Sequence, residues 1–134
     1  MVHLTEEIKT AMATMNVFPV ATASADGWPN VVPIGFVELV DDGTIWLADN
    51  FMLKTLANVK ENPKMSIYVW GPDTKGCFQI KGFVEVKTSG PEFEKMQETV
   101  FEKNSSLPAK GLLVMTITEI FECAPGAKAG AKII

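Results

Sequence analysis

The sequence contains no arginine and only one histidine, His3, among its 134 residues. Without a guanidinium group, the chain cannot clamp a phosphate through two parallel hydrogen bonds. A single histidine near the N-terminus supports neither a Ser-His-Asp triad nor a cluster of Cys and His metal ligands. We therefore expect no hydrolase chemistry and no metal site. His3 itself is a weak candidate for a catalytic acid, because terminal residues are usually poorly ordered.

Cysteines, long apolar runs and basic stripes are also scarce or absent. Cys77 and Cys123 lie in strand-like segments without a closely spaced second cysteine, so we interpret them as reduced core residues. The apolar runs fall far short of the roughly 20 residues of a membrane-spanning helix, and acidic residues stand where a secretory signal would be basic. The net charge is −4, which argues against a nucleic-acid partner. These absences predict a cytoplasmic protein that binds neither membrane nor nucleic acid.

The remaining composition is typical of one globular domain. Hydrophobic residues make up 47% of the chain and charged residues 21%, which are ordinary proportions for a folded protein. A chain of this length can bury one core of its own. No internal repeat or low-complexity linker divides it. The sequence therefore predicts a single domain over residues 1–134.

Apolar periodicity and turn signals predict three helices and six strands. The helices are one over residues 4–16 that Thr5 caps, a central one that carries Lys54 and Thr55 and ends at Asn62-Pro63, and one that begins with a Ser89–Glu92 capping box. The strands are expected over residues 17–23, 30–40, 44–48, 65–70, 76–87 and 111–123. On the third of these, Ile45 and Leu47 should face opposite to Trp46.

Two of the predicted strands carry residues that interrupt a regular ladder. The run 30–40 is largely apolar, so we expect it to be buried on both faces or nearly so. Pro33 removes a ladder donor and Gly35 removes a side chain, which indicates a bulge or a close approach to either another strand or a flat ligand. Gly82 interrupts the apolar face of the strand 76–87 and is a candidate for close packing or strand bending.

The order of these elements favours an antiparallel architecture. Consecutive hairpins follow one another, and helices are inserted between strands without a regular β-α-β alternation. This pattern indicates an antiparallel barrel of about six strands with capping helices. The predicted fold class is mainly β, or α+β.

The stretch from Ala48 to Lys64 carries the most suggestive chemistry. It leaves a strand, exposes Asp49 and Asn50, and turns into the helix whose first turn holds Lys54 and Thr55. A lysine and a hydroxyl at a helix start can hold a phosphate, because the free N–H groups and the positive end of the dipole point there. The plainer interpretation is a solvated helix start with Lys54 as surface charge.

The whole chain also resembles a known family. The segments that carry the resemblance are VATASADGWPNVVPIGF, IWLADNFMLKTLANVKENPKMSIYV and FQIKGFVEV, followed by the PGAKAG tail. They resemble the pyridoxamine 5′-phosphate oxidase-like split-barrel family, and within it the small FMN-binding proteins. The resemblance implies a six-stranded antiparallel split β-barrel with Greek-key character and capping helices. It also implies a homodimer with FMN at the subunit interface.

The resemblance assigns cofactor-binding positions in three segments and one separate strand. By this resemblance, the strand along the isoalloxazine ring holds Val32, Pro33, Ile34, Gly35 and Phe36. The strand end beside the ribityl chain and ring holds Ala48, Asp49 and Asn50, and the phosphate site holds Lys54 and Thr55. Gln79 matches a glutamine that reaches FMN in the oxidase branch. No catalytic residue is assigned.

The implied function is an FMN-binding oxidoreductase or electron carrier with an unidentified small-molecule or protein redox partner. The tail ECAPGAKAGAKII lacks arginine and histidine, whereas the pyridoxamine phosphate oxidases carry a basic, histidine-containing motif there. Vitamin B6 oxidation is therefore not expected. Two alternatives stay open. One is a non-catalytic module that stores or senses a flavin, a deazaflavin or haem, and the other is a split-barrel dimer that has lost its ligand.

Overall fold

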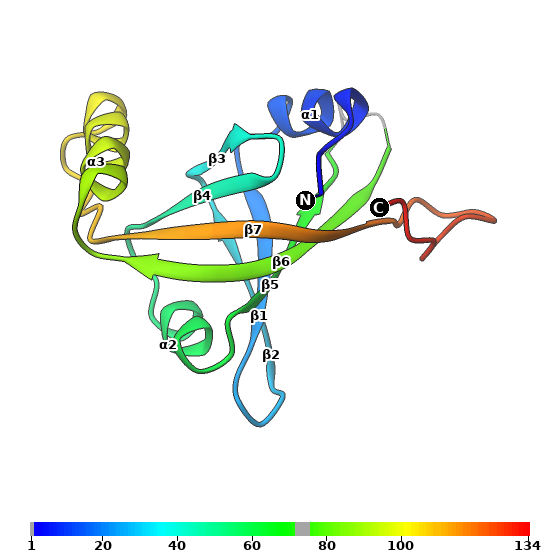
Figure 1. The fold of residues 1–134 in the computed structure, drawn as a ribbon, viewed down its shortest axis with the longest axis horizontal. Coiled ribbons are helices and arrows are strands. Elements are labelled where there is room, and N and C mark those ends of the chain that lie inside the picture. The colour runs from blue at the N-terminus through cyan, green and yellow to red at the C-terminus, as the bar shows by residue number, and fades with distance from the viewer. Residues whose placement is uncertain (1, 72–75) are drawn as a thin grey trace.

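The computed structural model describes residues 2–71 and 76–134, which form three helices and seven strands (Figure 1). The helices are α1 (Glu6–Ala13), α2 (Lys54–Glu61) and α3 (Pro91–Lys103). The strands are β1 (Phe18–Ala23), β2 (Pro29–Ile34), β3 (Val37–Asp41), β4 (Thr44–Asp49), β5 (Lys64–Val69), β6 (Phe78–Lys87) and β7 (Gly111–Glu122). Within these described residues, no helix is both long and apolar enough to cross a membrane.

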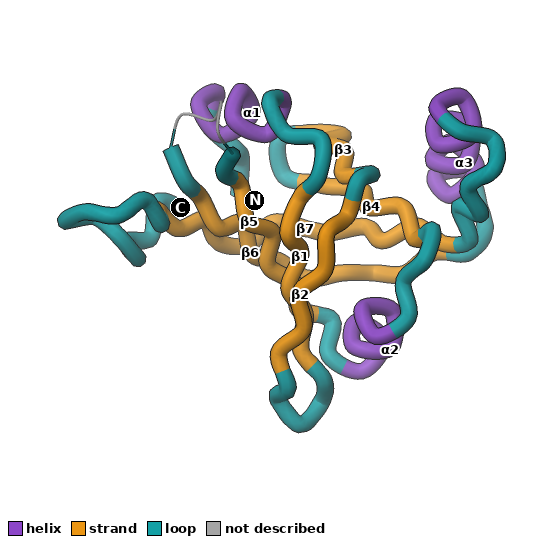
Figure 2. The backbone as a smooth tube through the Cα atoms, turned by 180° about the vertical axis from the view of Figure 1, so that it is seen from behind, coloured by secondary structure: helices purple, strands orange, loops and turns teal. Residues whose placement is uncertain are grey.

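All seven strands belong to one antiparallel sheet that curls into a half-barrel (Figure 2). The strand order is β2-β1-β5-β6-β7-β4-β3, so β4 lies beside β7 and not beside β5, its successor in the chain. β4 therefore pairs with the last strand of the consecutive set β5-β6-β7, and this arrangement has Greek-key character. The α2 helix, which connects β4 to β5, lies against β1 and β2.

The structure has seven strands where the sequence predicts six. The predicted strand 30–40 is in fact two strands that are separated at Gly35-Phe36. β2 pairs with β1, whereas β3 pairs with β4 at the other end of the sheet order. The single-strand prediction is wrong because apolar character alone does not show that the two halves have different partners.

The burial expected for this run is also wrong. Along β2 the side chains alternate between exposed and half-buried, and Val31 is 67% exposed. The physical reason is position, because β2 ends the sheet and in the described residues its one ladder partner is β1. Asn30, Val32 and Ile34 share the half-buried face.

Two apolar clusters hold the fold together, and β4 contributes to both. Ile45 and Leu47 lie in the main cluster, which the strands and α1 surround. Trp46 and Ala48 point the other way and pack with Met96 of α3 in a smaller cluster. The predicted opposite orientation of these β4 side chains is confirmed. Burying both faces of β4 fixes the position of its C-terminal end.

Gly82 lies where two strands come into very close contact. A Cβ at this position would lie 2.1 Å from the carbonyl oxygen of Thr116 on β7. The β6–β7 register shifts between Lys81 and Gly82. The predicted close packing is confirmed, and it explains why this position has no side chain.

Helix starts follow the sequence prediction once and depart from it once. Thr5 caps α1, with its hydroxyl accepting a hydrogen bond from the N–H of Ile8 (3.4 Å). The predicted Ser89–Glu92 capping box of α3 is wrong. Gly90 is the N-cap, with φ of +97°, and the Glu92 carboxylate instead accepts a hydrogen bond from Lys87 at 2.6 Å. The left-handed turn at Gly90 starts the helix one residue later than a Ser89 cap would.

Candidate functional site

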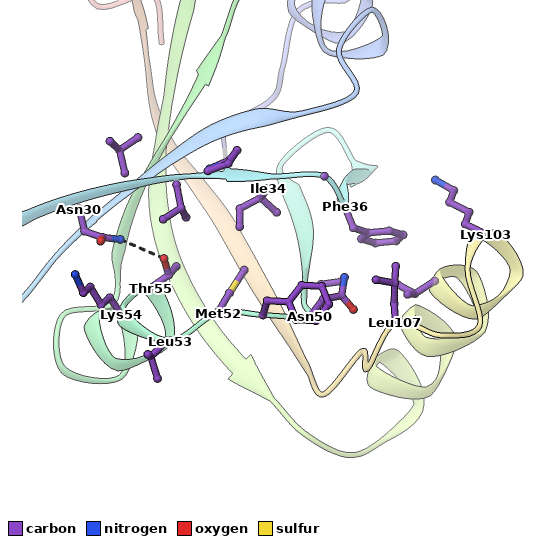
Figure 3. Close-up of a pocket in the computed structure, with 17 residues that line it drawn as sticks. Asn30, Ile34, Phe36, Asn50, Met52, Leu53, Lys54, Thr55, Lys103 and Leu107 are labelled. Carbon is purple, nitrogen blue, oxygen red and sulfur yellow. Dashed lines mark hydrogen bonds between the residues drawn. The ribbon is translucent and has the colours of Figure 1, made fainter.

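A pocket of about 770 Å³ opens beside β2, between the start of α2 and the end of α3 (Figure 3). One wall is β2 and its connection to β3, and another is the end of β4 with the loop that follows it. Figure 3 shows Asn30, Lys54 and Thr55 gathered at one end and Phe36, Lys103 and Leu107 at the other. Each end of the pocket therefore carries one lysine, and apolar side chains line the stretch between them.

Nine of the eleven residues that the sequence nominates line this one pocket. They are Val32, Pro33, Ile34, Gly35, Phe36, Ala48, Asn50, Lys54 and Thr55. Three separate segments of the chain contribute them, and the sheet brings these segments together. The other two nominated residues, Asp49 and Gln79, are not part of the lining.

The start of α2 forms one end of the pocket. Leu53 is the N-cap, and its side chain makes no capping hydrogen bond. Backbone N–H groups in the first turn of a helix have no intrahelical acceptor, so they are available to a ligand. Lys54 is exposed at this end, whereas the Thr55 side chain is only 2% exposed. The arrangement suits a bound anion.

Hydrogen bonds between side-chain amides and hydroxyls hold the residues at this end in place. Asn30 donates from Nδ2 to Thr55 Oγ1 at 3.2 Å and to Thr22 Oγ1 at 3.4 Å. Asn58 donates from its own Nδ2 to the same Thr22 oxygen at 3.0 Å. Thr22, Thr55 and Asn58 are buried polar residues. Buried polar groups need hydrogen-bond partners, and these bonds provide them.

Asp49 lies under the pocket wall. Its carboxylate is 1% exposed and accepts hydrogen bonds from the N–H of Met52 (2.9 Å) and from Lys110 Nζ (2.6 Å). The neighbouring Asn50 accepts a bond from the N–H of Ala109 at 2.9 Å through its side-chain oxygen. These contacts hold the loop after β4, so Asp49 shapes the pocket without lining it.

Gln79 lies on β6, opposite Tyr68 of β5 and Phe121 of β7. Its neighbours Phe78 and Ile80 point into the core, so Gln79 is on the outer face of the sheet. It is therefore not brought together with the other nominated residues within one chain.

At the second end of the pocket the sequence nominated Phe36 and missed the residues that α3 and the loop after it contribute. Lys103, in the last turn of α3, places Nζ 5.3 Å from the centre of the Phe36 ring, a distance at which a cation is attracted to an aromatic face. Val100 and Leu107 complete this end. No local signal marks these residues, since they reach the pocket only through the packing of α3 on β4.

The remaining missed residues belong to two segments that the sequence had already singled out. Asn30 and Val31 precede the nominated strand positions, and Phe51, Met52 and Leu53 connect Asn50 to Lys54. Phe51 and Leu53 are 79% and 81% exposed. A prediction for whole segments, and not for single matched positions, would have included them.

Ionisable groups in the lining are few. Among the described residues that line the pocket, Lys54 and Lys103 are the only ones with an ionisable side chain. In residues 2–71 and 76–134, no group of three or more His, Cys, Asp or Glu is close enough to hold a metal ion. The site can therefore bind an anion and an apolar body, and the described lining offers no carboxyl or imidazole for proton transfer.

A family comparison agrees with this fold. The model of the family described as pyridoxamine 5′-phosphate oxidase matches residues 4–124. An uncharacterized protein of Methanocaldococcus jannaschii is 37% identical, in an alignment that covers 98% of this chain and 89% of that protein. The chain belongs to the pyridoxamine 5′-phosphate oxidase-like family of split-barrel proteins.

Solved structures share this fold, and three of those named below have names that refer to different ligands. HupZ of Group A Streptococcus superposes with a TM-score of 0.81 at 27% identity, covering 95% of this chain and 99% of that one. An FMN-binding protein of Syntrophomonas wolfei has a TM-score of 0.70 at 22% identity, covering 89% and 84%. An F420 reductase (0.69, 16% identity) and the haem storage protein HutZ of Vibrio cholerae (0.66, 20% identity) share the fold. The fold alone therefore does not specify the ligand.

Proposed function

We propose that this protein is an FMN-binding flavoprotein that acts as an oxidoreductase or an electron carrier. The observation that carries the proposal is the pocket, which joins a helix start with Lys54 and Thr55 to an apolar wall from β2. A phosphate monoester fits the first part, and a flat aromatic ring system fits the second. FMN combines these two groups in one molecule.

The dimensions and donor groups of the pocket support this assignment. Its volume of about 770 Å³ is within the range of roughly 300–1,000 Å³ that small-molecule and cofactor sites occupy. In place of an arginine clamp, the chain offers the Lys54 ammonium, the Thr55 hydroxyl and the N–H groups of the first turn of α2. Phosphate at a helix N-terminus is a recurrent arrangement.

Each part of the chain has a task in this proposal. Lys54, Thr55 and the α2 N–H groups bind the phosphate, and the backbone from Val32 to Phe36 lies along the ring. Asp49 holds the loop that forms the opposite wall. When bound, FMN supplies the capacity to accept and donate electrons, and the protein provides binding, orientation and electrostatics.

We also propose that the functional unit is a homodimer whose partner subunit covers the open side of the pocket. Val31, Phe51 and Leu53 all line the pocket, yet they are 67%, 79% and 81% exposed in the single chain. A cluster of exposed large apolar side chains around a pocket is typical of an interaction surface. We expect Leu53→Asp to shift the protein to monomers in analytical ultracentrifugation. A wild-type monomer at all accessible concentrations would contradict the dimer.

The first test is a titration of the purified protein with FMN, followed by flavin fluorescence. Lys54→Ala should weaken FMN binding about tenfold or more, which is the effect expected from losing a charged hydrogen bond. Lys103→Ala is the matched control, because it removes the same charge from the other end of the pocket. An equal loss in both variants, or no loss in Lys54→Ala, would contradict the phosphate assignment.

The alternative function is a non-catalytic module for a flavin, a deazaflavin or haem. The absence of a carboxyl or imidazole among the described lining residues supports storage or sensing over turnover. Haem is disfavoured, since Met52 is the one described lining residue of the types that usually hold haem iron. Oxidation of a reduced nicotinamide nucleotide by the FMN-loaded protein, with an added electron acceptor, would identify an enzyme. A Soret band after haem addition would favour the haem module.

A further inference from the structure

The hydroxyl of Thr55 is held in a particular hydrogen-bonding role by its neighbour Asn30. Thr55 is 2% exposed, lines the pocket and accepts a hydrogen bond of 3.2 Å from Asn30 Nδ2 (Figure 3). A hydroxyl has one proton to donate and two lone pairs that accept. Because Asn30 fills an acceptor position, the Thr55 proton needs an acceptor elsewhere.

The orientation of the Asn30 amide is itself held from a second side. Asn30 Nδ2 also donates to Thr22 Oγ1, and that oxygen receives another amide hydrogen from Asn58. Two donors to one hydroxyl oxygen occupy both of its lone pairs. Thr22 therefore serves as an acceptor for the Asn30 NH₂ group, which keeps this group facing both threonines.

The Thr55 hydroxyl can direct its proton into the pocket, which it lines. In the described part of the chain, no acceptor is hydrogen-bonded to the Thr55 hydroxyl. Thr55 lines the pocket at the same end as Lys54 and the uncapped first turn of α2. A buried donor without an acceptor is costly, so an oxyanion at this place would complete the network.

We propose that Asn30 is a positioning residue for anion binding. By donating to Thr55 Oγ1, it commits the Thr55 proton to an oxygen of a phosphate monoester at the start of α2. The site then distinguishes the phosphorylated ligand from the same ligand without its phosphate. This proposal rests on the proposed function, because it deepens the role of the same phosphate end. It also explains how a site with one nearby lysine and no arginine holds a dianion.

The test compares FMN with riboflavin, which has the same ring and ribityl chain but no phosphate. In Asn30→Ala, FMN binding should weaken about tenfold, the loss expected for a misdirected hydrogen bond to a charged group, while riboflavin binding stays constant. Asn30→Asp should lose more, because a carboxylate accepts the Thr55 proton and repels the anion. Asn58→Ala is the matched control, since it removes the other donor to Thr22 and leaves the Asn30–Thr55 bond in place.

A double-mutant cycle separates positioning from general disruption. Thr55→Val removes the hydroxyl with little change in shape, and the double variant Asn30→Ala/Thr55→Val should bind FMN no more weakly than Thr55→Val alone. Additive losses would overturn the proposal. Equal weakening of FMN and riboflavin in Asn30→Ala, or the same loss of FMN selectivity in Asn58→Ala, would also overturn it.

Inorganic phosphate serves as a probe that does not depend on flavin binding. We expect phosphate to shift the amide NMR signals of Lys54 and Thr55 in the wild type, and to shift them much less in Asn30→Ala. If the wild type binds neither flavin but shows this Asn30-dependent response, the FMN proposal fails and the positioning role is supported. If the wild type responds to neither flavin nor phosphate, both proposals are overturned.

Discussion

Lys110 donates a hydrogen bond of 2.6 Å from its ammonium group to the carboxylate of Asp49, which is 1% exposed. The same ammonium reaches the carbonyl oxygen of Met52 at 3.2 Å, while the other carboxylate oxygen of Asp49 accepts from the N–H of Met52. The pair therefore binds both the backbone N–H and the backbone carbonyl of Met52, which lies in the pocket wall. It connects the end of β4, the loop before α2 and the residue before β7.

The first prediction concerns this clamp. Lys110→Met should lower the free energy of unfolding by about 1–3 kcal/mol, because a buried carboxylate then loses its charged partner. Lys87→Met is the matched control, since Lys87 forms an ion pair of the same length, 2.6 Å, with Glu92, whose side chain is 47% exposed, and an ion pair with a solvated carboxylate contributes little to stability. Urea denaturation measures both. Equal losses in the two variants would contradict a special role for the Asp49 clamp.

The second prediction concerns the close contact between β6 and β7 at Gly82. Gly82→Ala should destabilise the protein by about 1–3 kcal/mol or more, since the new methyl group would collide with the Thr116 carbonyl oxygen. Gly35→Ala is the control, because no atom lies within 4 Å of a Cβ built there. Thermal unfolding followed by circular dichroism compares the two. A Gly82→Ala protein with an unchanged melting temperature would show that the strands can separate at no cost.

The sequence predicts the parts of the fold that depend on local periodicity. The alternation of Ile45, Trp46 and Leu47 identifies the two faces of β4 correctly, because side chains in a strand alternate with a period of two. The division of residues 30–40 into β2 and β3 depends on which distant strand each half pairs with. Such pairing is a property of the whole sheet, and no local pattern contains it.

The candidate site shows the same limit. Lys54 and Thr55 can be nominated from the sequence, because a helix start after a strand is a local feature. Lys103 cannot, since it reaches the pocket only after α3 packs on Trp46 and Ala48. The predicted exposure of Asp49 is wrong, because its carboxylate is 1% exposed and forms an ion pair with Lys110 beneath the lining.

The last prediction concerns the stability of the protein at alkaline pH. Cys77 and Cys123 place their sulfur atoms 2.8 Å apart, and Tyr68 shares a 3.2 Å hydrogen bond with Cys77. Burial, followed by the hydrogen bond with Cys77, raises the pKa of Cys123 to about 12 from 9.0. The hydrogen bond with Cys77, followed by burial, raises the pKa of Tyr68 to about 12 from 10.0.

Raised pKa values of acidic groups mean that the folded protein retains protons that the unfolded chain has already lost. The contribution of these two groups to the free energy of unfolding should therefore be constant below about pH 9 and decrease from there towards pH 12. Cys123→Ser removes one of these groups, so its decrease between pH 9 and 12 should be shallower than that of the wild type. Urea denaturation at several pH values, with a reducing agent present, measures the difference. The lysines remain in both proteins, so they do not affect the comparison. Parallel curves for the two proteins would contradict the prediction, because they would show that Cys123 ionises equally easily in the folded and unfolded chain.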